Sequence, residues 1–290
     1  MSWADLHMHS RWSDGEWAPP KLVRAGRHAG LGALALTDHD DVRGYPEMAA
    51  AGAEYGVEIL SGVEVSSWRD GTDIHILGYG FDPKDRALAE LFAASRATRR
   101  DRAERMVQKL AELGAPIEME AVLAIAGDAT IGRPHVARAL VEAGHVPTMR
   151  EAFDRWLGDG KPACVDKLRV SPADAIAALH AAGGVAVCAH PVTLGGPGTA
   201  ALDLLVEEGL DGVEVRHSLH GAGVEAHLDR YAREHVLLRT GGSDFHGPRL
   251  GSSEPGGVTI PREWWDAILE RVEQWRASAG KASRGAGRGN

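Results

Sequence analysis

DLHMHS, residues Asp5–Ser10, places two histidines two positions apart where a short apolar strand is predicted to end. Because successive side chains of a strand point to opposite faces, His7 and His9 point the same way. Two neutral imidazoles on one face provide half of a metal site. SDFH, near the other end of the chain, repeats this spacing with Asp244 and His246. These two pairs predict a metal site built from distant parts of the sequence.

Seven short apolar runs, two of which precede these pairs, predict β-strands. They lie near Ser2–Leu6, Gly32–Leu36, Glu58–Val63, Asp73–Gly78, Val185–Ala189, Gly212–Val215 and Val236–Arg239. Amphipathic or alanine-rich stretches between most of them predict helices, namely Pro20–Ala29, Pro46–Tyr55, Pro172–Ala182, Ala200–Glu208 and Val224–Glu234. This alternation implies an α/β fold with a parallel sheet. Because ligand-capable residues follow nearly every strand, we expect a closed barrel with its site at the C-terminal mouth.

One long segment breaks the alternation of strands and helices. From Pro83 to about Lys167 the pattern predicts helices only, and so many residues are too long for a loop within a barrel. We therefore expect barrel segments at 1–83 and 168–277, with an inserted helical cap at 84–167. The tail at 278–290 is rich in Gly, Ser and Arg and poor in apolar residues, which predicts disorder.

The bulk composition is that of an ordinary globular protein, with 44% hydrophobic and 25% charged residues. No apolar run reaches the length that spans a bilayer, so we expect no membrane association. Only two cysteines occur, and DLHMHS begins too early to follow a signal peptide, which favours a cytoplasmic location. The net charge of −9 argues against binding of duplex DNA but does not exclude an anionic substrate.

Nine candidate metal ligands follow or end six of the seven predicted strands. They are His7, His9, Asp14, His39, Glu64, His75, His190, Asp244 and His246. Any single histidine at a strand end is more often structural than ligating, and Asp14 in SDG also suits an ordinary turn. Asp38 and Asp40 could orient His39 instead of binding metal. A barrel, however, would bring all nine positions to one mouth.

Nine ligands exceed what one ion needs, so the set indicates two or three divalent ions. Glu64 is the natural bridge, since each carboxylate oxygen can serve a different ion. A set of imidazoles and carboxylates without thiolates suits Mn²⁺, Fe²⁺ or Zn²⁺, and the sequence does not choose among them.

The order of these motifs resembles that of the polymerase and histidinol phosphatase (PHP) family: His-x-His, TDH, a Glu followed by a His, AHP and Asp-x-His. The resemblance covers about Ala4–Gly247. It implies a distorted seven-stranded (β/α)7 barrel with two or three metal ions. His7, His9, Glu64 and Asp244 would hold the first ion; Glu64, His75 and His190 the second; Asp14, His39 and His246 the third.

Asp14 departs from the histidine that many family members carry at this position. Together with the cap, this departure is similar to the subgroup that removes the 3′-phosphate of nucleoside 3′,5′-bisphosphates and trims short 5′-phosphorylated oligoribonucleotides. We therefore expect a metal-dependent phosphoesterase that uses a metal-activated hydroxide and takes a small phosphorylated substrate, a nucleotide or short RNA. The leaving alkoxide would take its proton from His220, or from a water on the ion held by Asp14 and His246.

The predicted cap offers residues that could bind a second phosphate. Arg133, beside His135 in the segment IGRPHVARAL, lies at a predicted helix start, where free N–H groups bind anions. Lys161 is a second cation candidate, and His220 after the sixth strand is a third substrate contact. Each of these side chains could equally be an ordinary surface or packing residue.

Four arginines, Arg96, Arg99, Arg102 and Arg105, recur every three residues in the cap and roughly share one helix face. The favoured interpretation is a solvated face paired with Asp101 and Glu104. The alternative is an electropositive lining of the barrel mouth.

Three other functions compete with the bisphosphate reading. The first is hydrolysis of histidinol phosphate or another small phosphomonoester. The second is a non-catalytic, metal-stabilised module, which the complete ligand set disfavours. The third is metal-dependent hydrolysis of an amide or lactone, which phosphate inhibition would separate from phosphoester hydrolysis.

Overall fold

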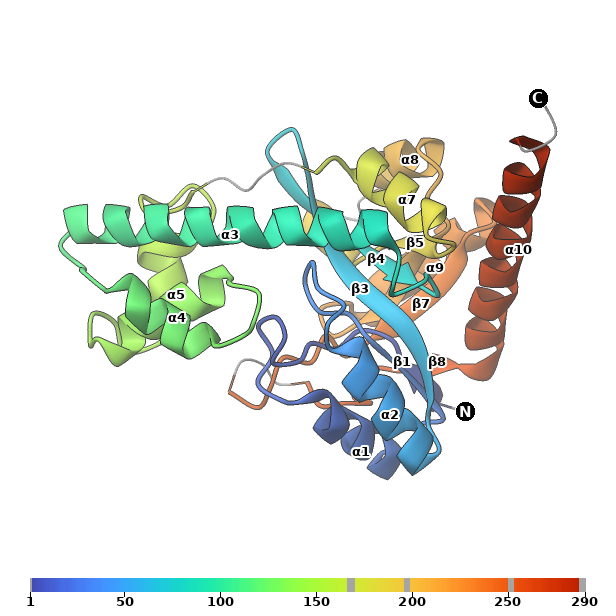
Figure 1. Ribbon diagram of the computed structural model, residues 1–290, viewed down its shortest axis with the longest axis horizontal. Helices are drawn as coiled ribbons and strands as arrows, with labels where there is room; N and C mark the ends of the chain where they lie inside the picture. The colour runs from blue at the N-terminus through green and yellow to red at the C-terminus, as the bar shows by residue number, and fades with distance from the viewer. Residues whose placement is uncertain (1, 166–169, 196–198, 250–252, 287–290) are drawn as a thin grey trace.

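Eight strands lie side by side in a single curved sheet of the computed structural model, which describes residues 2–165, 170–195, 199–249 and 253–286, with side chains through 277. Their order is β7-β6-β5-β4-β3-β2-β1-β8 (Figure 1). The strands are β1 (Ser2–Asp5), β2 (Ala33–Leu36), β3 (Glu58–Arg69), β4 (Thr72–Tyr79), β5 (Val185–Cys188), β6 (Gly212–His217), β7 (Leu238–Gly242) and β8 (Ile260–Pro261). Strands β1 to β7 correspond to the seven predicted runs. The two-residue β8, antiparallel to β1, is too short to leave a pattern.

The sheet nearly closes on itself, because the chain beyond β1 meets the chain beyond β7. Leu6 N donates to Gly241 O at 3.2 Å, and Met8 forms a parallel bridge with Phe245. The buried Asp5 carboxylate adds to the seam by accepting from Ser243 N at 3.0 Å. The expected barrel-like α/β fold is confirmed, with eight strands in place of seven.

Strand β4 corrects the expectation of a parallel sheet. It runs antiparallel to both neighbours, β3 and β5, because a tight hairpin joins β3 to β4. Asp70 and Gly71 form the turn with φ of +48° and +92°. An Asp-Gly pair is the usual signal of a two-residue hairpin, since both central residues need positive φ. The hairpin turns His75 toward the barrel mouth, opposite Ser66.

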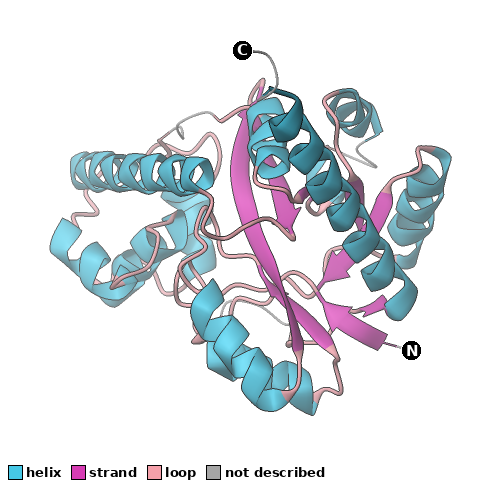
Figure 2. Cartoon of the chain, turned by 45° about the vertical axis from the view of Figure 1, so that its right-hand side comes forward, coloured by secondary structure: helices cyan, strands magenta, loops and turns pink. Residues whose placement is uncertain are grey.

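Helices surround the outside of the sheet (Figure 2). They are α1 (Pro19–His28), α2 (Tyr45–Tyr55), α7 (Pro172–Ala181), the 3₁₀ turn η2 (Pro191–Leu194), α8 (Thr199–Glu207), α9 (Ala222–Glu234) and α10 (Arg262–Ala286). Small and branched apolar side chains from strands and helices form one main core between them. Ser171 caps α7 by accepting from Asp174 N, with Pro172 in the first turn. The sequence thus marks where this helix begins.

The backbone of α10 is helical up to Ala286, whereas the composition of the tail predicted disorder from position 278. Ala, Lys and Arg in this stretch favour helix, and a helix already formed propagates at little cost. Positions 287–290 of the predicted tail lie outside the described residues. No helix among the described residues is long and apolar enough to cross a bilayer.

The segment predicted to be a cap is helical throughout its described part. It contains α3 (Arg86–Glu112), α4 (Met119–Ala126), α5 (Arg133–Glu142), α6 (Met149–Ala152) and the π-helical turn η1 (Phe153–Leu157). Its buried side chains form a cluster of their own, separate from the barrel core. Helix α3, about 40 Å long from its 27 residues, belongs to both clusters. Leu88 and Phe92 pack on the barrel, whereas Met106 and Leu110 pack in the cap. Figure 1 shows α3 extending from the sheet to the group of helices that contains α4 and α5.

Candidate metal centre

The nine candidate ligands come together at one end of the barrel. His7, His9, Asp14, His39, His190, Asp244 and His246 follow strands, while Glu64 lies within β3 and His75 within β4. Two hairpin-paired strands therefore contribute side chains from their interiors, and the four segments that follow β1, β2, β5 and β7 contribute the others. The ligand atoms of eight candidates, all except His190, fall into overlapping groups whose atoms lie within 4.8 Å of one another.

The first group is His7, His9, Glu64 and Asp244. The Nε2 atoms of His7 and His9 lie 3.2 and 3.1 Å from Glu64 Oε2, and 3.3 and 3.2 Å from Asp244 Oδ1. Two ligand atoms about 2.1 Å from one ion, at octahedral or tetrahedral angles, lie about 3.0–3.4 Å apart. The spacing of this group therefore fits one shared cation, and its members are those expected for the first ion.

The other oxygen of Glu64 faces a second pair of imidazoles. Oε1 lies 2.6 Å from His75 Nδ1 and 3.0 Å from His190 Nε2. Glu64 thus presents one oxygen to each of two groups, which is the geometry that a bridging carboxylate needs. His39 Nδ1 also approaches this residue, at 3.2 Å from Oε2.

The third group surrounds Asp14, which lies in the turn after β1. Its carboxylate oxygens are 3.4 Å from His246 Nε2, 3.7 Å from His39 Nε2 and 3.7 Å from His9 Nδ1. These separations are longer than those of the first group. The residues still converge as the motif order implied, with His9 as an added neighbour.

Buried ring nitrogens show that the pocket suits a cation. Both nitrogens of His9, Nδ1 of His39 and Nε2 of His217 are buried without a hydrogen bond in the described structure. A buried polar atom without a partner costs about 1–3 kcal/mol, so native structures seldom keep several together. Lone pairs of neutral imidazoles that converge with carboxylates on one point are the donor set for a divalent metal.

The carboxylates of the cluster are held ionised. Burial alone would raise the pKa of Glu64, but His39, His75 and His7 outweigh it and keep that pKa well below its usual range. Asp14 and Asp244 behave in the same way beside their own imidazoles. Three ionised carboxylates in one buried cluster require compensating positive charge. Divalent cations bound where the three carboxylates meet the imidazoles would supply that charge.

The imidazoles do not respond alike to this environment. Burial lowers the pKa of His39 to about 3. Burial also opposes protonation of His9, but the adjacent carboxylates of Asp244 and Glu64 outweigh it and raise the pKa of His9 to about 10. The first group therefore has the stronger attraction for positive charge.

Two residues of β6 complete the cluster, and the sequence interpretation did not assign either to it. Glu214 is fully buried, lies 2.9 Å from His7 Nδ1 through Oε1 and accepts from His190 N at 2.7 Å. His217 Nε2 lies 3.3 Å from Asp244 Oδ2. A carboxylate buried in the apolar strand GVEVRH needs a partner, and this was the available signal for Glu214. His217 ends its strand as the other ligand candidates do.

Asp38 and Asp40 do not orient His39, contrary to one expectation. Asp38 accepts from the backbone N–H and the hydroxyl of Ser10, both at 2.7 Å. Asp40 pairs with Arg99 of the cap helix α3, whose Nε–H donates to it at 2.9 Å. Both carboxylates shape the loops that carry the ligand candidates.

The arginine face of α3 also differs from the favoured interpretation of a solvated surface. Arg99 reaches the barrel mouth, and Arg102 is buried and donates to Val165 O. Arg96 approaches Asp41 at 3.9 Å, whereas Arg105 is exposed. Arg96 and Arg99 therefore face the barrel mouth, as in the alternative interpretation, whereas Arg102 is buried within the cap and Arg105 faces solvent.

A cleft of about 720 Å³ opens between the cluster and the cap. Its barrel side carries Asp14, Asp244, His246 and the exposed Leu219, and its cap side carries Pro134, Met149 and Phe153. We refer to this space as the cleft. It joins candidate ligands to apolar cap residues, which suits a substrate with a phosphate at one end and a ring at the other.

The predicted substrate residues occupy different positions around this space. Arg133 begins α5 as expected, but it pairs with Asp159 at 2.6 Å and approaches Asp73 at 3.7 Å. His135 is buried and accepts from Gly132 N at 2.9 Å. Lys161 is exposed. His220 is buried beside His217, with Nδ1–H donating to Val215 O at 2.9 Å, and does not line the described part of the cleft.

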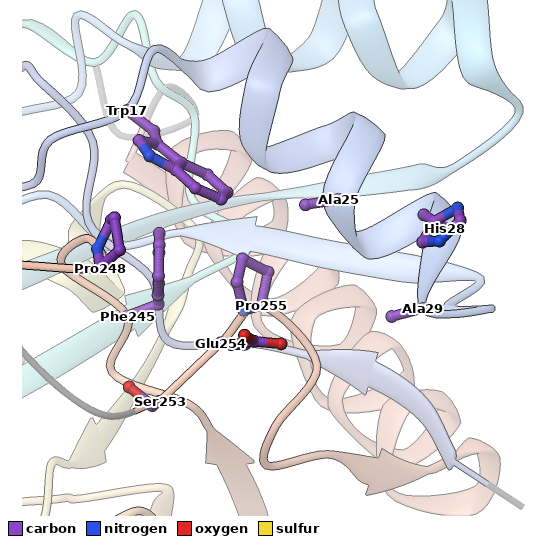
Figure 3. A pocket seen from close by; sticks show the side chains of 9 residues that line it. All are labelled: Trp17, Ala25, His28, Ala29, Phe245, Pro248, Ser253, Glu254 and Pro255. Carbon is purple, nitrogen blue, oxygen red and sulfur yellow. The ribbon is translucent and has the colours of Figure 1, made fainter.

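A second cavity, of about 510 Å³, lies on the far side of Phe245 (Figure 3). Trp17 and residues in and just after α1 form one wall, and Phe245, Pro248 and residues 253–255 form the other. The Trp17 and Phe245 rings meet edge to face at 4.7 Å. None of the nine candidate ligands lines this cavity. Its walls therefore contribute to packing of the SDFH loop on the side away from the cluster.

Comparison with known proteins places the chain in a family. The PHP domain model matches residues 5–156, about half of the sequence. This chain belongs to the PHP family. The match runs from the end of β1 through β2, β3 and β4 and most of the cap, and hence includes the His-x-His, TDH and Glu–His motifs.

Curated relatives extend the likeness over most of the chain. A 5′-3′ exoribonuclease of Haemophilus influenzae is 38% identical over 247 residues, 84% of this chain and 90% of that protein. A 3′,5′-nucleoside bisphosphate phosphatase of Chromobacterium violaceum is 37% identical over 92% of this chain and 97% of its own length. Both names denote hydrolysis of phosphoesters, and this PHP protein is a metal-dependent phosphoesterase.

A solved structure agrees with the fold. A Bifidobacterium adolescentis protein, provisionally described as a metal-dependent phosphoesterase, superimposes with a TM-score of 0.87 and 34% identity. The match covers 93% of this chain and 96% of that one. Barrel and cap are therefore shared with this protein.

Proposed function

We propose that this enzyme removes the 3′-phosphate of nucleoside 3′,5′-bisphosphates and also shortens 5′-phosphorylated oligoribonucleotides from their 5′ end. The observation that carries this proposal is the cleft, which has candidate metal ligands on one side and a cap with apolar and cationic residues on the other. The two curated relatives, named for these two activities, support the same substrates.

We propose that the nine ligand candidates hold two or three ions of Mn²⁺, Fe²⁺ or Zn²⁺. The spacing of the first group and the two-sided position of Glu64 support at least two positions. Such ions would supply Lewis acidity and lower the pKa of bound water toward about 7. The chain's own part is to keep Glu64, Asp14 and Asp244 ionised and the imidazole rings fixed.

The cap is proposed to be the inserted unit at 84–167, and it would bind the end of the substrate that does not react. Its separate hydrophobic core supports the assignment, although α3 also packs on the barrel. Arg133 is 18% exposed and close to Phe153, with its guanidinium 5.9 Å from the ring centroid. A 5′-phosphate would compete with the exposed Asp159 for this guanidinium, while the nucleobase lies on Phe153. Lys161 and His135 remain proposed contacts.

His220 is proposed to supply the proton to the leaving 3′ oxygen. Burial lowers the pKa of His220, which opposes this role in the ground state. Its buried Nε2 has no partner in the described structure, which supports a proton-transfer role only if the ring becomes accessible. Comparing His220→Ala on the natural substrate and on an activated aryl phosphate tests this. Equal losses on both would contradict the assignment, since an activated leaving group needs no acid.

The narrow space beneath the cap and the net charge of −9 support exclusion of duplex DNA. A cytoplasmic location is supported by two cysteines that are both unpaired.

The decisive experiment couples elemental analysis of bound metal to a screen of phosphate release. We expect at least two metal equivalents, and a kcat/KM for 3′,5′-bisphosphates well above that for simple monophosphates, including histidinol phosphate. Glu64→Gln, which keeps shape but removes charge, should lose both metal and activity. A preference for histidinol phosphate or another monoester would refute the proposed substrate.

A further inference from the structure

A second, narrower passage leaves the cluster beside the cleft. This groove, which we call the side groove, holds about 190 Å³ and runs between the first barrel loop and the cap. Asp14, Pro134, Met149 and Arg249 line both spaces, so the cluster lies where they meet. A molecule bound at Asp14 can therefore extend in two directions.

Three arginines line the side groove from different parts of the fold. Arg11 comes from the loop after β1, Arg138 from α5 of the cap, and Arg249 from the segment after β7. Their opposing carboxylates are Asp14, which belongs to the metal cluster, and Glu16. Once Asp14 is engaged by cations, the lining has positive charge in excess.

In the described part of the chain, each of these arginines forms an ion pair in which its own side chain is exposed. Arg138 pairs with Glu142, Arg249 with Glu16 and Arg11 with Glu47, and the arginine side chains are 44%, 70% and 58% exposed. Such pairs are worth about 1 kcal/mol or less, so an incoming phosphate can replace or share them. For Arg138 and Arg249 the hydrogen bond found uses Nε–H, and a guanidinium carries four further N–H donors.

The proposed reaction on RNA needs a second passage. Water oxygen bonds to the phosphorus that links the first two nucleotides, the bond from phosphorus to the first 3′ oxygen breaks, and that oxygen takes a proton. The products are a nucleoside 5′-phosphate and a shortened RNA that keeps the reacted phosphate at its 5′ end. With a bisphosphate the reacted phosphate carries nothing more. With RNA it carries the rest of the strand, while the first nucleotide fills the cleft.

We propose that the side groove is the path of the second and later nucleotides of a single-stranded RNA, gripped at its phosphates by Arg11, Arg138 and Arg249. This inference rests on the proposed function and extends it to the longer substrates. No Phe, Tyr or Trp occurs among the described residues that line the groove, in contrast to Phe153 in the cleft. The downstream strand is thus held by charge, without base stacking, and its sequence does not matter.

Arg138→Glu tests the groove, with Arg100→Glu as the matched control. Both arginines lie on exposed faces of cap helices and pair with a glutamate four residues later. The substrates are a nucleoside 3′,5′-bisphosphate and a 5′-phosphorylated pentaribonucleotide. Arg138→Glu should raise the ratio of the pentanucleotide KM to the bisphosphate KM roughly fivefold, the upper range for an exposed charge. It should also reduce the slope of log KM against log salt by about 0.7.

The experiment distinguishes failure of the side-groove proposal from failure of the proposed function. If the wild-type enzyme hydrolyses the bisphosphate but not the pentanucleotide, or if both variants change the ratio equally, the side groove is not the RNA path. If the wild-type enzyme hydrolyses neither substrate, the proposed function fails. The groove is then judged by the Kd of a fluorescein-labelled pentaribonucleotide, where equal values for the two variants would overturn it.

Discussion

Glu214 acts on the metal cluster from behind His7. Its carboxylate is fully buried, and His7 Nδ1–H donates to it at 2.9 Å, which leaves Nε2 of His7 directed at Glu64 and Asp244. An imidazole whose rear N–H meets a carboxylate is a better electron donor and cannot rotate. Glu214 is therefore a positioning residue for the first group.

Glu214→Gln should keep the hydrogen bond but lose the charge. We expect metal affinity to fall by about 10- to 100-fold, the usual effect of removing such a partner. Titration calorimetry with Mn²⁺ measures this directly, and Glu142→Gln on the exposed side of α5 is the control. Unchanged affinity would show that Glu214 serves the fold alone.

Asp14→Ala should remove the third group while the protein stays folded. The carboxylate lies among His9, His39 and His246, so its loss removes the carboxylate ligand candidate of the third group. We expect one metal equivalent fewer by elemental analysis and a fall in kcat on the order of 100-fold or more. Circular dichroism checks the fold. Wild-type turnover in this variant would show that the reaction does not need an ion in the third group.

At the scale of elements, one buried ion pair fastens the cap helix to the barrel mouth. Arg99 of α3 donates to Asp40, whose side chain is only 2% exposed, and to Ser66 Oγ at 2.7 Å. Burial opposes the charge on Asp40, but Arg99 keeps the pKa of that carboxyl below its ordinary value. The pair holds α3 against β3 and the loop after β2.

Arg99→Ala should lower the free energy of unfolding by about 3 kcal/mol, because it leaves a buried carboxylate without its partner. Urea denaturation measures the loss. Adding Asp40→Asn should recover part of it, and asparagine tolerates the φ of +50° at this position. Arg100→Ala, exposed on the same helix, should change stability by less than about 0.5 kcal/mol. Equal effects at 99 and 100 would contradict the role of the pair.

The sequence predicted the elements better than their directions. Apolar runs located seven strands, and the missing strand pattern predicted the helical segment from α3 to η1. The antiparallel direction of β4 could also have been predicted, since Asp70-Gly71 is a hairpin signal. The alternation of strands and helices favoured a parallel sheet instead. Periodicity alone could not say that Arg99 and Arg102 face inward, because burial of an arginine depends on acceptors such as Asp40 and Val165 O from distant segments.

The candidate site was predictable where residues follow strands in motifs. His7, His9, Glu64 and Asp244 converge as the motif order implied, with Glu64 between two groups. Glu214 was not predicted as part of the site, because it lies inside a strand and belongs to no paired motif. The roles of Arg133, Lys161 and His220 stay predictions, since the contacts of a substrate are not written in the spacing of the chain.

On the scale of the whole molecule, Asp211 ties the C-terminal helix to the barrel. It accepts from Ala186 N of β5, from Trp275 Nε1 and from Arg271 of α10, and it meets His180 of α7 at 2.7 Å. Burial raises the pKa of Asp211, but these hydrogen bonds outweigh it and hold the pKa below 3.8. Ionised Asp211 thus connects three elements, namely β5, α7 and α10.

Asp211→Asn should destabilise the protein at pH 7 and flatten its acid unfolding profile. Because the folded pKa is depressed, the contribution is complete above the ordinary value of 3.8 and is lost as pH falls through the lower folded value. Thermal unfolding between pH 3 and 7 measures it. Parallel profiles of the variant and the wild-type protein would mean that Asp211 carries no linked stability.

The length of α3 decides how this enzyme admits its substrates. A single helix is anchored in the barrel core by Leu88 and Phe92 and in the cap core by Met106 and Leu110. A rotation of the cap relative to the barrel would bend that helix and break its backbone hydrogen bonds. The width of the cleft entrance is therefore set when the protein folds. Substrates are selected by their size rather than by closure of the cap.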